Sequence, residues 1–155
     1  MATRKIVYEG DETLRKTCRP IKEIDKRTKM LLSDMAETMY AAQGVGLAAP
    51  QVGVLRRLVV IDVGEGLLEL INPVITQTEG SMVNVEGCLS IPGKRGTVER
   101  PEKVVVRAMD RHGHDIEVTG TGLLAMALCH EIDHLDGVLY IDKMIEDVTG
   151  KETED

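Results

Sequence analysis

The spacing of apolar residues predicts one helix in the first third of the chain and another in the last. Between Asp25 and Gly44, apolar side chains recur at helical intervals. These positions are Leu32, Met35, Ala36, Met39 and Ala42. Asp25 is a residue type that caps helix starts, and Gly44 is one that ends helices. A second helical pattern covers residues 123–135, and Gly137 ends it.

The middle of the chain changes to short β-branched runs that predict strands. These runs are bounded by Gly, Asn, Asp or Pro and cover residues 58–61, 68–75, 82–85, 104–109 and 116–118. Residues 110–113 read Asp-Arg-His-Gly, which is typical of a hairpin turn. We therefore expect an α+β fold in which mainly antiparallel strands pack around the C-terminal helix. At 155 residues the chain suits a single domain, which we place at residues 1–145, with a polar, acidic tail at residues 146–155.

Residues 38–55 carry no charge, which makes this stretch nearly as long as a membrane span. Its residues are wrong for a helix in lipid, because they include Gln43, Gly44, Gly46, Pro50, Gln51 and Gly53. We expect an uncharged loop surrounded by close packing. Arg4 and Lys5 near the start are not followed by an apolar segment, so a signal peptide is not expected and the cytoplasm is the expected location.

Composition narrows the possible functions. The chain has no Phe, no Trp and three Tyr, so an aromatic platform for single-stranded nucleic acid is not expected. Acidic residues outnumber basic ones by 26 to 19, and the net charge of −7 disfavours direct nucleic-acid binding. The three cysteines are too few for a disulfide framework and indicate a reducing compartment. A domain of this length needs no structural metal for stability, so a metal here would have another role.

The segment His130-Glu131-Ile132-Asp133-His134 carries the clearest chemistry. Its two histidines are four residues apart in the predicted helix, so both imidazoles can face one metal ion. Glu131 follows the first histidine and can reach a water on that metal without binding the metal itself. The alternative is a pair of buried histidines in hydrogen bonds, which would be costly to bury without partners.

A third ligand would decide the class of metal site. The metzincin pattern is excluded, because Tyr140 stands where a third histidine is required. A gluzincin-type site would need a downstream Glu, and the candidates, Glu146, Glu152 and Glu154, lie in the acidic tail. Cys88 follows a predicted strand and Gly87, and its thiolate is the remaining soft ligand.

A third segment, residues 44–51, reads Gly-Val-Gly-Leu-Ala-Ala-Pro-Gln and lacks the Lys and Ser/Thr of a phosphate loop. Together the three segments resemble the peptide deformylase family. Residues 44–51 match its G-x-G-L-A-A-x-Q motif, residues 86–90 match E-G-C-L-S, and residues 130–134 match H-E-x-x-H. The resemblance extends from about Ile6 to about Met144.

The resemblance implies a metal-dependent hydrolase that removes the N-formyl group, as formate, from the formylmethionine of newly made polypeptides. Cys88, His130 and His134 would hold one divalent metal ion, natively Fe²⁺, with Zn²⁺, Ni²⁺ or Co²⁺ as alternatives, and water would take the fourth position. Glu131 would act as general base and then as general acid.

The resemblance also implies roles for residues around the reacting group. The Gln51 side chain and the Leu89 backbone N–H would stabilise the oxyanion. Gly46 and Gly87 would let the substrate lie alongside as an added strand. The methionine pocket would be formed by Val45, Leu123, Met126 and Ala127, although each of these also suits an ordinary core. Arg95 corresponds to an arginine near the cleft, although a solvated surface role fits it as well.

Three features differ from the family pattern or fall outside it. Cys129 replaces the Gln that commonly precedes the first histidine. We expect a packed thiol, because successive residues of a helix are turned about 100° from each other; as a fourth ligand Cys129 would close the site. Gly10 stands where Pro is common, which affects only a turn. His112 and His114 are expected in an exposed hairpin turn rather than in a second metal site.

The expected partners are N-formylmethionyl nascent peptides, met in passing encounters with the ribosome by a monomer that binds neither membranes nor nucleic acid. Two other classes remain open at this point. One is a small zincin-like endopeptidase, and the other is a metal sensor or structural metal domain in which Glu131 would be idle.

Overall fold

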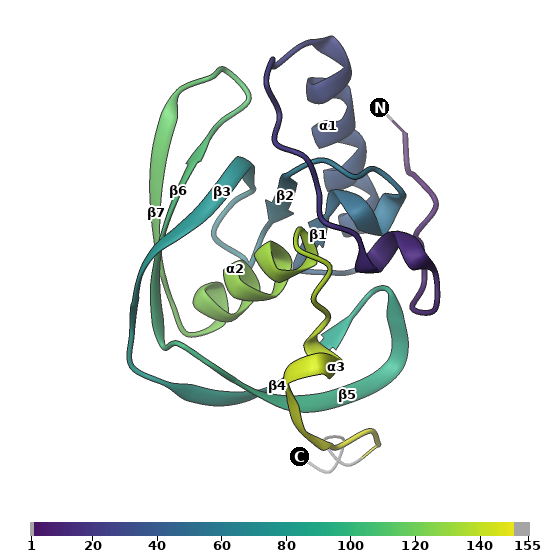
Figure 1. Ribbon diagram of the computed structural model, residues 1–155, viewed down its shortest axis with the longest axis vertical. Coiled ribbons are helices and arrows are strands. Elements are labelled where there is room, and N and C mark those ends of the chain that lie inside the picture. The colour runs from purple at the N-terminus through teal and green to yellow at the C-terminus, as the bar shows by residue number, and fades with distance from the viewer. Residues whose placement is uncertain (1, 151–155) are drawn as a thin grey trace.

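The structure is a computed structural model that describes residues 2–150 (Figure 1). The helices are α1 (Lys26–Ala41), α2 (Leu123–His134) and the short α3 (Tyr140–Lys143), with 3₁₀ turns η1 (Glu12–Arg15) and η2 (Ala49–Val52). The strands are β1 (Gly46–Ala48), β2 (Leu58–Ile61), β3 (Leu68–Glu79), β4 (Met82–Cys88), β5 (Ile91–Arg100), β6 (Lys103–Met109), β7 (Asp115–Thr121) and β8 (Met144–Asp147).

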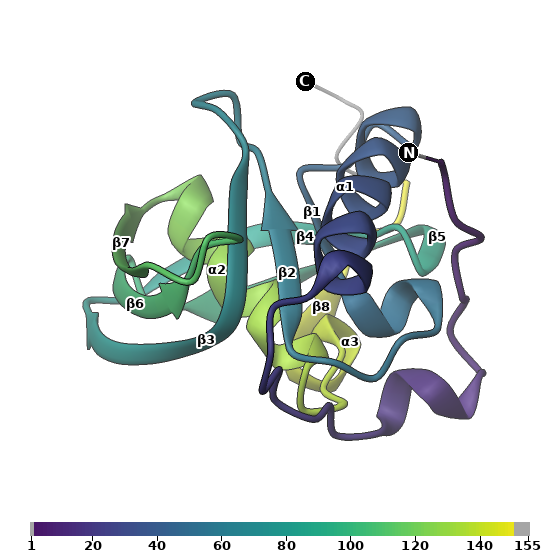
Figure 2. The same ribbon diagram turned by 90° about the horizontal axis from the view of Figure 1, so that it is seen from above.

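The strands form two antiparallel sheets with α2 between them. One sheet has the order β1-β2-β3-β6-β7 and the other the order β4-β5-β8. Figures 1 and 2 show α2 crossing the middle of the molecule. Its Ala125, Leu128 and Ile132 share one buried cluster with Val59 and Leu70 of the larger sheet. The expected α+β fold, with mainly antiparallel strands around the C-terminal helix, is confirmed.

Helix α1 packs against the larger sheet through the side chains that gave its sequence a helical period. Leu32, Met35 and Met39 are fully buried and share a cluster with Leu47 and Leu58. The helix begins as expected, because the Asp25 side chain accepts a hydrogen bond of 2.9 Å from the Thr28 N–H. It ends at Ala41, slightly before the expected stop.

The uncharged stretch is more regular than the loop we expected. It contains the end of α1, strand β1 and the turn η2, and Leu47, Ala48 and Ala49 are fully buried. A three-residue strand in a Gly- and Ala-rich segment is too short to show an alternating pattern, which explains why the sequence did not reveal it. The expected close packing around this stretch is present.

Strand β8 includes the first two residues of the expected C-terminal tail. Glu146 pairs with Thr97 and Asp147 pairs with Gly96, so the first residues of the expected tail belong to the smaller sheet. The rest of that tail, residues 151–155, lies outside the described part of the chain. The domain division at residue 146 therefore stays a prediction. No helix among residues 2–150 is both long and apolar enough to cross a membrane.

Gly137 provides a test of the packing between the end of α2 and the N-terminal segment. Its φ is +76°, and a Cβ there would collide with the backbone of Arg15. Gly113 has a similar φ of +82°, but a Cβ there would meet only Ile24 Cδ1 at 3.9 Å. We expect Gly113→Ala to lower the free energy of unfolding by about 1 kcal/mol through backbone strain alone. Gly137→Ala adds overpacking and should cost about 2 to 4 kcal/mol.

Denaturant unfolding of both variants measures this difference. Equal losses of stability in the two variants would show that the contact between Gly137 and Arg15 does not constrain the fold.

Candidate active site

The end of β4 and one face of α2 bring together a cysteine and two histidines. One ligand atom from each of Cys88, His130 and His134 lies within 4.8 Å of the others, and no other group of this kind occurs among residues 2–150. Cys88 Sγ is 3.3 Å from His134 Nε2, and the two imidazole centroids are 5.1 Å apart. A thiolate with two imidazoles is a donor set that suits Fe²⁺, Zn²⁺, Ni²⁺ or Co²⁺. These three residues could therefore hold one transition-metal ion.

A buried carboxylate orients the first histidine. Glu86 Oε1 lies 2.8 Å from His130 Nδ1. Arg100 clamps the same carboxylate with bonds of 2.8 Å from Nε and 2.9 Å from Nη2. Burial raises the pKa of Glu86, but the hydrogen bonds from Arg100 and His130 outweigh it and lower that pKa overall. Because an ionised carboxylate only accepts, His130 donates from Nδ1, and its Nε2 lone pair is left for a metal.

The sequence did not reveal this clamp. Arg100 extends it by donating to Asp133 Oδ2 at 2.8 Å, and Lys143 Nζ lies 3.0 Å from the same oxygen. The side chains of β5 alternate, and Gly96, Val98 and Arg100 are all buried. An arginine on the inward face of a strand is the signal that would have found it, but β5 itself was not predicted.

Glu131 lies beside the proposed ligands and is buried, with 4% of its surface exposed. Its Oε2 is 3.9 Å from His130 Nε2, and its Oε1 has no hydrogen-bond partner in the described part of the protein. Burial raises the pKa of Glu131 to about 7. A carboxyl group with that pKa can both take and return a proton near neutral pH.

Gly46 makes room for this carboxylate. A Cβ on Gly46 would lie 2.5 Å from Glu131 Oε2, closer than two such atoms can approach. The glycine of β1 therefore has a packing role at the site that the sequence did not predict.

The Gln51 side chain is fixed at both ends. Its Oε1 accepts a hydrogen bond of 3.0 Å from the Ala48 N–H, and its Nε2 donates to Ser90 Oγ at 3.1 Å. The same Nε2 lies 3.5 Å from Cys88 Sγ. Because the amide oxygen is occupied by a backbone donor, the NH₂ group must face the cysteine side of the site.

These residues line a cleft of about 660 Å³. The lining includes every site residue expected from the sequence except His134: Val45, Gly46, Gln51, Gly87, Cys88, Leu89, Arg95, Leu123, Met126, Ala127, His130 and Glu131. Val45 and Leu123 are exposed, with 43% and 49% of their surfaces accessible, whereas Ala127 is buried. The cleft thus has an apolar rim and a polar floor that contains the candidate metal ligands.

The residues set aside in the sequence lie outside this group. Cys129 is packed in the core around α2, where burial raises the pKa of its thiol. Tyr140 stacks on His130 at a centroid distance of 5.9 Å, and its hydroxyl donates to the Lys94 carbonyl at 3.0 Å. His112 and His114 lie exposed in the turn between β6 and β7, as expected.

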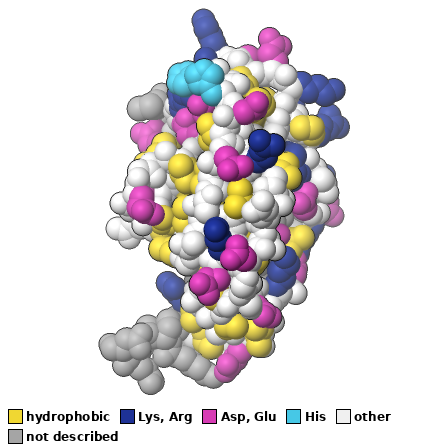
Figure 3. Space-filling view, turned by 90° about the vertical axis from the view of Figure 1, so that its left-hand side faces the viewer, with side chains coloured by type: hydrophobic (Ala, Val, Ile, Leu, Met, Phe, Trp, Pro, Cys, Tyr) yellow, Lys and Arg dark blue, Asp and Glu magenta, His cyan; other side chains and the backbone are white. Residues whose placement is uncertain are grey.

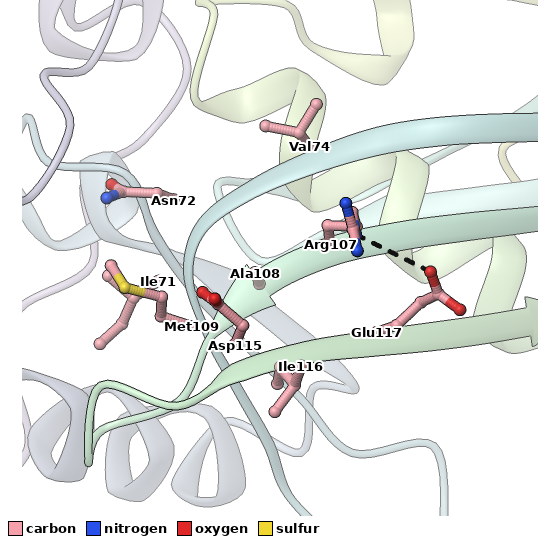
Figure 4. A pocket seen from close by; sticks show the side chains of 9 residues that line it. All are labelled: Ile71, Asn72, Val74, Arg107, Ala108, Met109, Asp115, Ile116 and Glu117. Atoms are coloured by element: carbon pink, nitrogen blue, oxygen red, sulfur yellow. Dashed lines mark ion pairs between the residues drawn. The ribbon is translucent and has the colours of Figure 1, made fainter.

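A second hollow lies over β3, β6 and β7 (Figure 4). Arg107 and Glu117 face each other across it at 3.9 Å, and both are well exposed. Such a solvated pair contributes little energy. None of the site residues expected from the sequence lines this hollow.

Comparison with known proteins agrees with the geometry of the cleft. Residues 3–149 match the family model described as polypeptide deformylase. A peptide deformylase of Acetivibrio thermocellus is 62% identical over 99% of this chain and 91% of its own length. One from Caldicellulosiruptor bescii is 58% identical over 99% of this chain and 93% of its own length.

The solved structures that this chain resembles are also peptide deformylases. The crystal structure of a peptide deformylase from Legionella pneumophila superposes with a TM-score of 0.89 at 49% identity, covering 92% of this chain and 86% of that one. The peptide deformylase of Synechococcus elongatus in complex with actinonin gives a TM-score of 0.88 at 45% identity, covering 90% and 77%. Fold and site define a metal-dependent hydrolase. The chain belongs to the polypeptide deformylase family.

Gly46→Ala tests whether the space beside Glu131 matters. The added methyl group should displace the Glu131 carboxylate, and kcat for deformylation should fall about 10² to 10⁴-fold, the usual contribution of a positioned acid–base group. Metal content should stay at the wild-type level, because the three atoms nearest to the added methyl group all belong to Glu131 and none to a proposed ligand. Steady-state kinetics with metal analysis measures both. Unchanged kcat would show that the carboxylate does not need this position.

Glu86→Gln tests the clamp on His130. Loss of the negative charge should weaken metal binding about 10- to 100-fold, because the partner of a ligating histidine orients the ring and raises its basicity. Chelator competition on folded protein gives the affinity. Glu99→Gln is the matched control, since Glu99 lies exposed on the same sheet. Equal metal affinity in the two variants would contradict the role of the clamp.

Proposed function

We propose that this protein removes the formyl group, as formate, from the N-terminal formylmethionine of newly made polypeptides, with Cys88, His130 and His134 as metal ligands. The observation that carries the proposal is the convergence of three donor atoms within 4.8 Å beside the buried carboxyl of Glu131. Such a site combines three protein ligands with an adjacent acid–base group, as catalytic metal sites do.

The donor set fits a divalent metal. His130 is held in the required tautomer by Glu86, and the partly buried Cys88 supplies a soft ligand. A metal ion held by these residues would supply Lewis-acid chemistry, which can polarise a carbonyl and lower the pKa of a water molecule towards about 7. We propose Fe²⁺ as the native ion, with Zn²⁺, Ni²⁺ and Co²⁺ as ions that the same ligands accept.

Glu131 moves the proton. In the proposed reaction its carboxylate accepts a proton from the water that attacks the formyl carbon. It then returns that proton to the α-amine as the bond between carbon and nitrogen breaks. Burial raises the pKa of this carboxyl, which makes it a stronger base than an exposed carboxylate and so favours the first of these transfers.

Two donors stabilise the negative charge on the formyl oxygen. The Gln51 NH₂ group is oriented by Ala48 and Ser90, and it is aimed at the side of the cleft where Cys88 lies. The backbone N–H of Leu89 is the second proposed donor. Removal of one donor of this kind typically costs about 3 to 4 kcal/mol in the transition state, so Gln51 should affect kcat more than stability.

The cleft walls position the peptide. Gly46 and Gly87 lack side chains that would keep an extended substrate away from β1 and β4. The proposed methionine pocket has an apolar, polarisable lining, which suits a thioether: Val45, Leu123, Met126 and Ala127. Arg95 is proposed to contact the substrate farther along the cleft.

The cellular setting follows from the substrate. The relatives are bacterial proteins, and formylated chains are made on ribosomes. We propose that the protein works in the cytoplasm, as a monomer that meets nascent peptides in passing encounters with the ribosome.

The direct test measures formate released from a formyl-Met-Ala-Ser peptide by anaerobically purified protein, together with its metal content. We expect formate release, no cleavage of internal peptide bonds and one iron per chain. Glu131→Gln should keep the metal and lose at least about 10³-fold in kcat, whereas Cys88→Ser should lose the metal. Asp136→Asn, an exposed change just after α2, is the control and should behave as wild type.

The rival classes give different results. Cleavage of internal bonds would indicate an endopeptidase. Bound metal without hydrolysis of either bond would indicate a sensor or structural site. Full activity of Glu131→Gln would contradict the proposed proton transfer.

A further inference from the structure

The net charge of −7 conceals two parts of opposite sign. Residues 2–29 together with Arg56 and Arg57 hold eleven of the 19 basic residues and five of the 26 acidic ones. The remainder holds eight basic and 21 acidic residues. At physiological salt, charges more than about 8 Å apart are largely screened, so a partner at the cationic part responds to that part and not to the total.

The cationic part contains a groove of about 930 Å³, which we name the α1 groove. The segment before α1, the first turns of α1 and residues 54 and 56 line it. Its cationic lining residues are Arg4, Arg19, Lys22, Arg27 and Arg56. Two acids also line it, Glu23 and Asp25. This excess of cations contrasts with the face in Figure 3, where acidic and basic side chains are interspersed.

Two of these charges are already compensated inside the protein. Arg4 pairs with Asp34 at 3.0 Å. The Asp25 carboxylate accepts hydrogen bonds from the Thr28 N–H and hydroxyl at 2.9 and 3.0 Å. The cations that remain for a ligand are Arg19, Lys22, Arg27 and Arg56.

Arg19 and Arg56 are held side by side. Their backbones form a parallel β-bridge, with the Arg19 N–H donating to the Leu55 carbonyl at 3.1 Å. Like charges in paired positions repel. Neither guanidinium forms an ion pair or hydrogen bond with any other residue in the range 2–150. An anion bound between them would remove this repulsion.

The start of α1 shows the same imbalance. The Asp25 carboxylate caps this end, but the first turn beyond the cap has three cations, Lys26, Arg27 and Lys29, and no acidic residue. Acids are favoured at this positive end of a helix and cations are not. Two independent placements of charge are therefore unfavourable in the free protein, and both become favourable beside a polyanion. Departures from local rules of this kind are typical of functional surfaces.

The lining favours a phosphate chain over an acidic protein. The apolar lining is scattered: Ile21 and Leu31 belong to the core and are only 8% and 7% exposed, Val54 is half-buried, and Met30 and Pro20 are exposed. A protein partner needs a buried apolar centre, which this groove does not offer. The planar guanidinium groups match phosphate oxygens. No aromatic residue lines the groove, so bases would not stack.

We propose that the α1 groove binds the backbone of single-stranded RNA without sequence preference. The choice of RNA as the polyanion rests on the proposed function, because newly made polypeptides are met beside RNA. Helix α1 has 16 residues, which is about 24 Å at about 1.5 Å per residue. Residues at its start line the groove, and residues just after its end line the cleft. Bound RNA would leave the cleft open.

The test uses a labelled 12-nucleotide uridine oligomer and fluorescence anisotropy at 50 and 200 mM salt. Affinity should fall with salt, with a slope of about 0.7 for each phosphate contacted. The double variant Arg19→Ser/Arg56→Ser should bind at least about tenfold more weakly at 50 mM salt, and its slope should be shallower by about 1.4. Lys103→Ser/Arg107→Ser, which removes the same charge from exposed positions on β6, should bind as wild type.

Several outcomes would overturn the proposal: no binding at 50 mM salt, equal binding by the two double variants, or an oligoglutamate of 12 residues binding as tightly as the RNA. The last result would assign the groove to acidic polypeptides. Formate release from a short formyl-Met peptide, measured on the same proteins, should be unchanged in both variants. Wild-type protein that releases no formate but shows the expected RNA binding would contradict the proposed function and leave the groove assignment standing.

Discussion

The buried carboxylate of Glu86 is the constraint on which the site depends. It joins the smaller sheet to α2, because Arg100 of β5 clamps it from one side and His130 of α2 bonds it from the other. Removing such charges from water is costly unless each is fully paired, and here all of them are. The clamp fixes α2 against β4. Cys88, two residues after Glu86, is thereby brought to the two histidines.

Burial of the site makes the clamp on Glu86 necessary, and it also raises the pKa of the proposed acid–base group, Glu131. Glu131 lies on the metal side of α2 in a region with little access to water, so its pKa rises to about 7, whereas the paired Glu86 remains ionised. Two carboxylates a short distance apart therefore differ in role because their partners differ. Gly46 completes the arrangement by leaving space for the Glu131 oxygen.

The elements and the proposed ligands that could be predicted from the sequence are those whose patterns are local. Helix α1 has a clear period and an Asp cap, and the two histidines are one helical turn apart, so both could be predicted. Strand β5 was missed because Pro92, Gly93 and several charges interrupt its pattern. Its inward-facing Gly96 leaves space for the Met144 side chain of β8. Because Gly96 and Met144 are far apart in the sequence, local patterns could not reveal this contact.

Long-range pairing explains what else the sequence did not show. The bond between Glu86 and Arg100 joins two strands, and nothing in the neighbouring residues indicates that Arg100 points inward. The proposed third ligand, Cys88, was suggested by exclusion of other ligands and by the family resemblance, and not by spacing, since it lies 42 residues before His130. Net charge was similarly uninformative, because it averaged the cationic α1 groove with an acidic remainder.

In the proposed site, Cys88, His130 and His134 are the only protein ligands of the metal, and Cys129 stays in the core. X-ray absorption of the zinc-loaded protein measures the ligand set directly. We expect one sulfur at about 2.3 Å and two imidazole nitrogens at about 2.0 to 2.1 Å, with one lighter oxygen ligand. Cys129→Ser should leave the sulfur signal unchanged, because Cys129 is packed in the core around α2. Two sulfur ligands, or a sulfur signal that disappears in Cys129→Ser, would contradict the account.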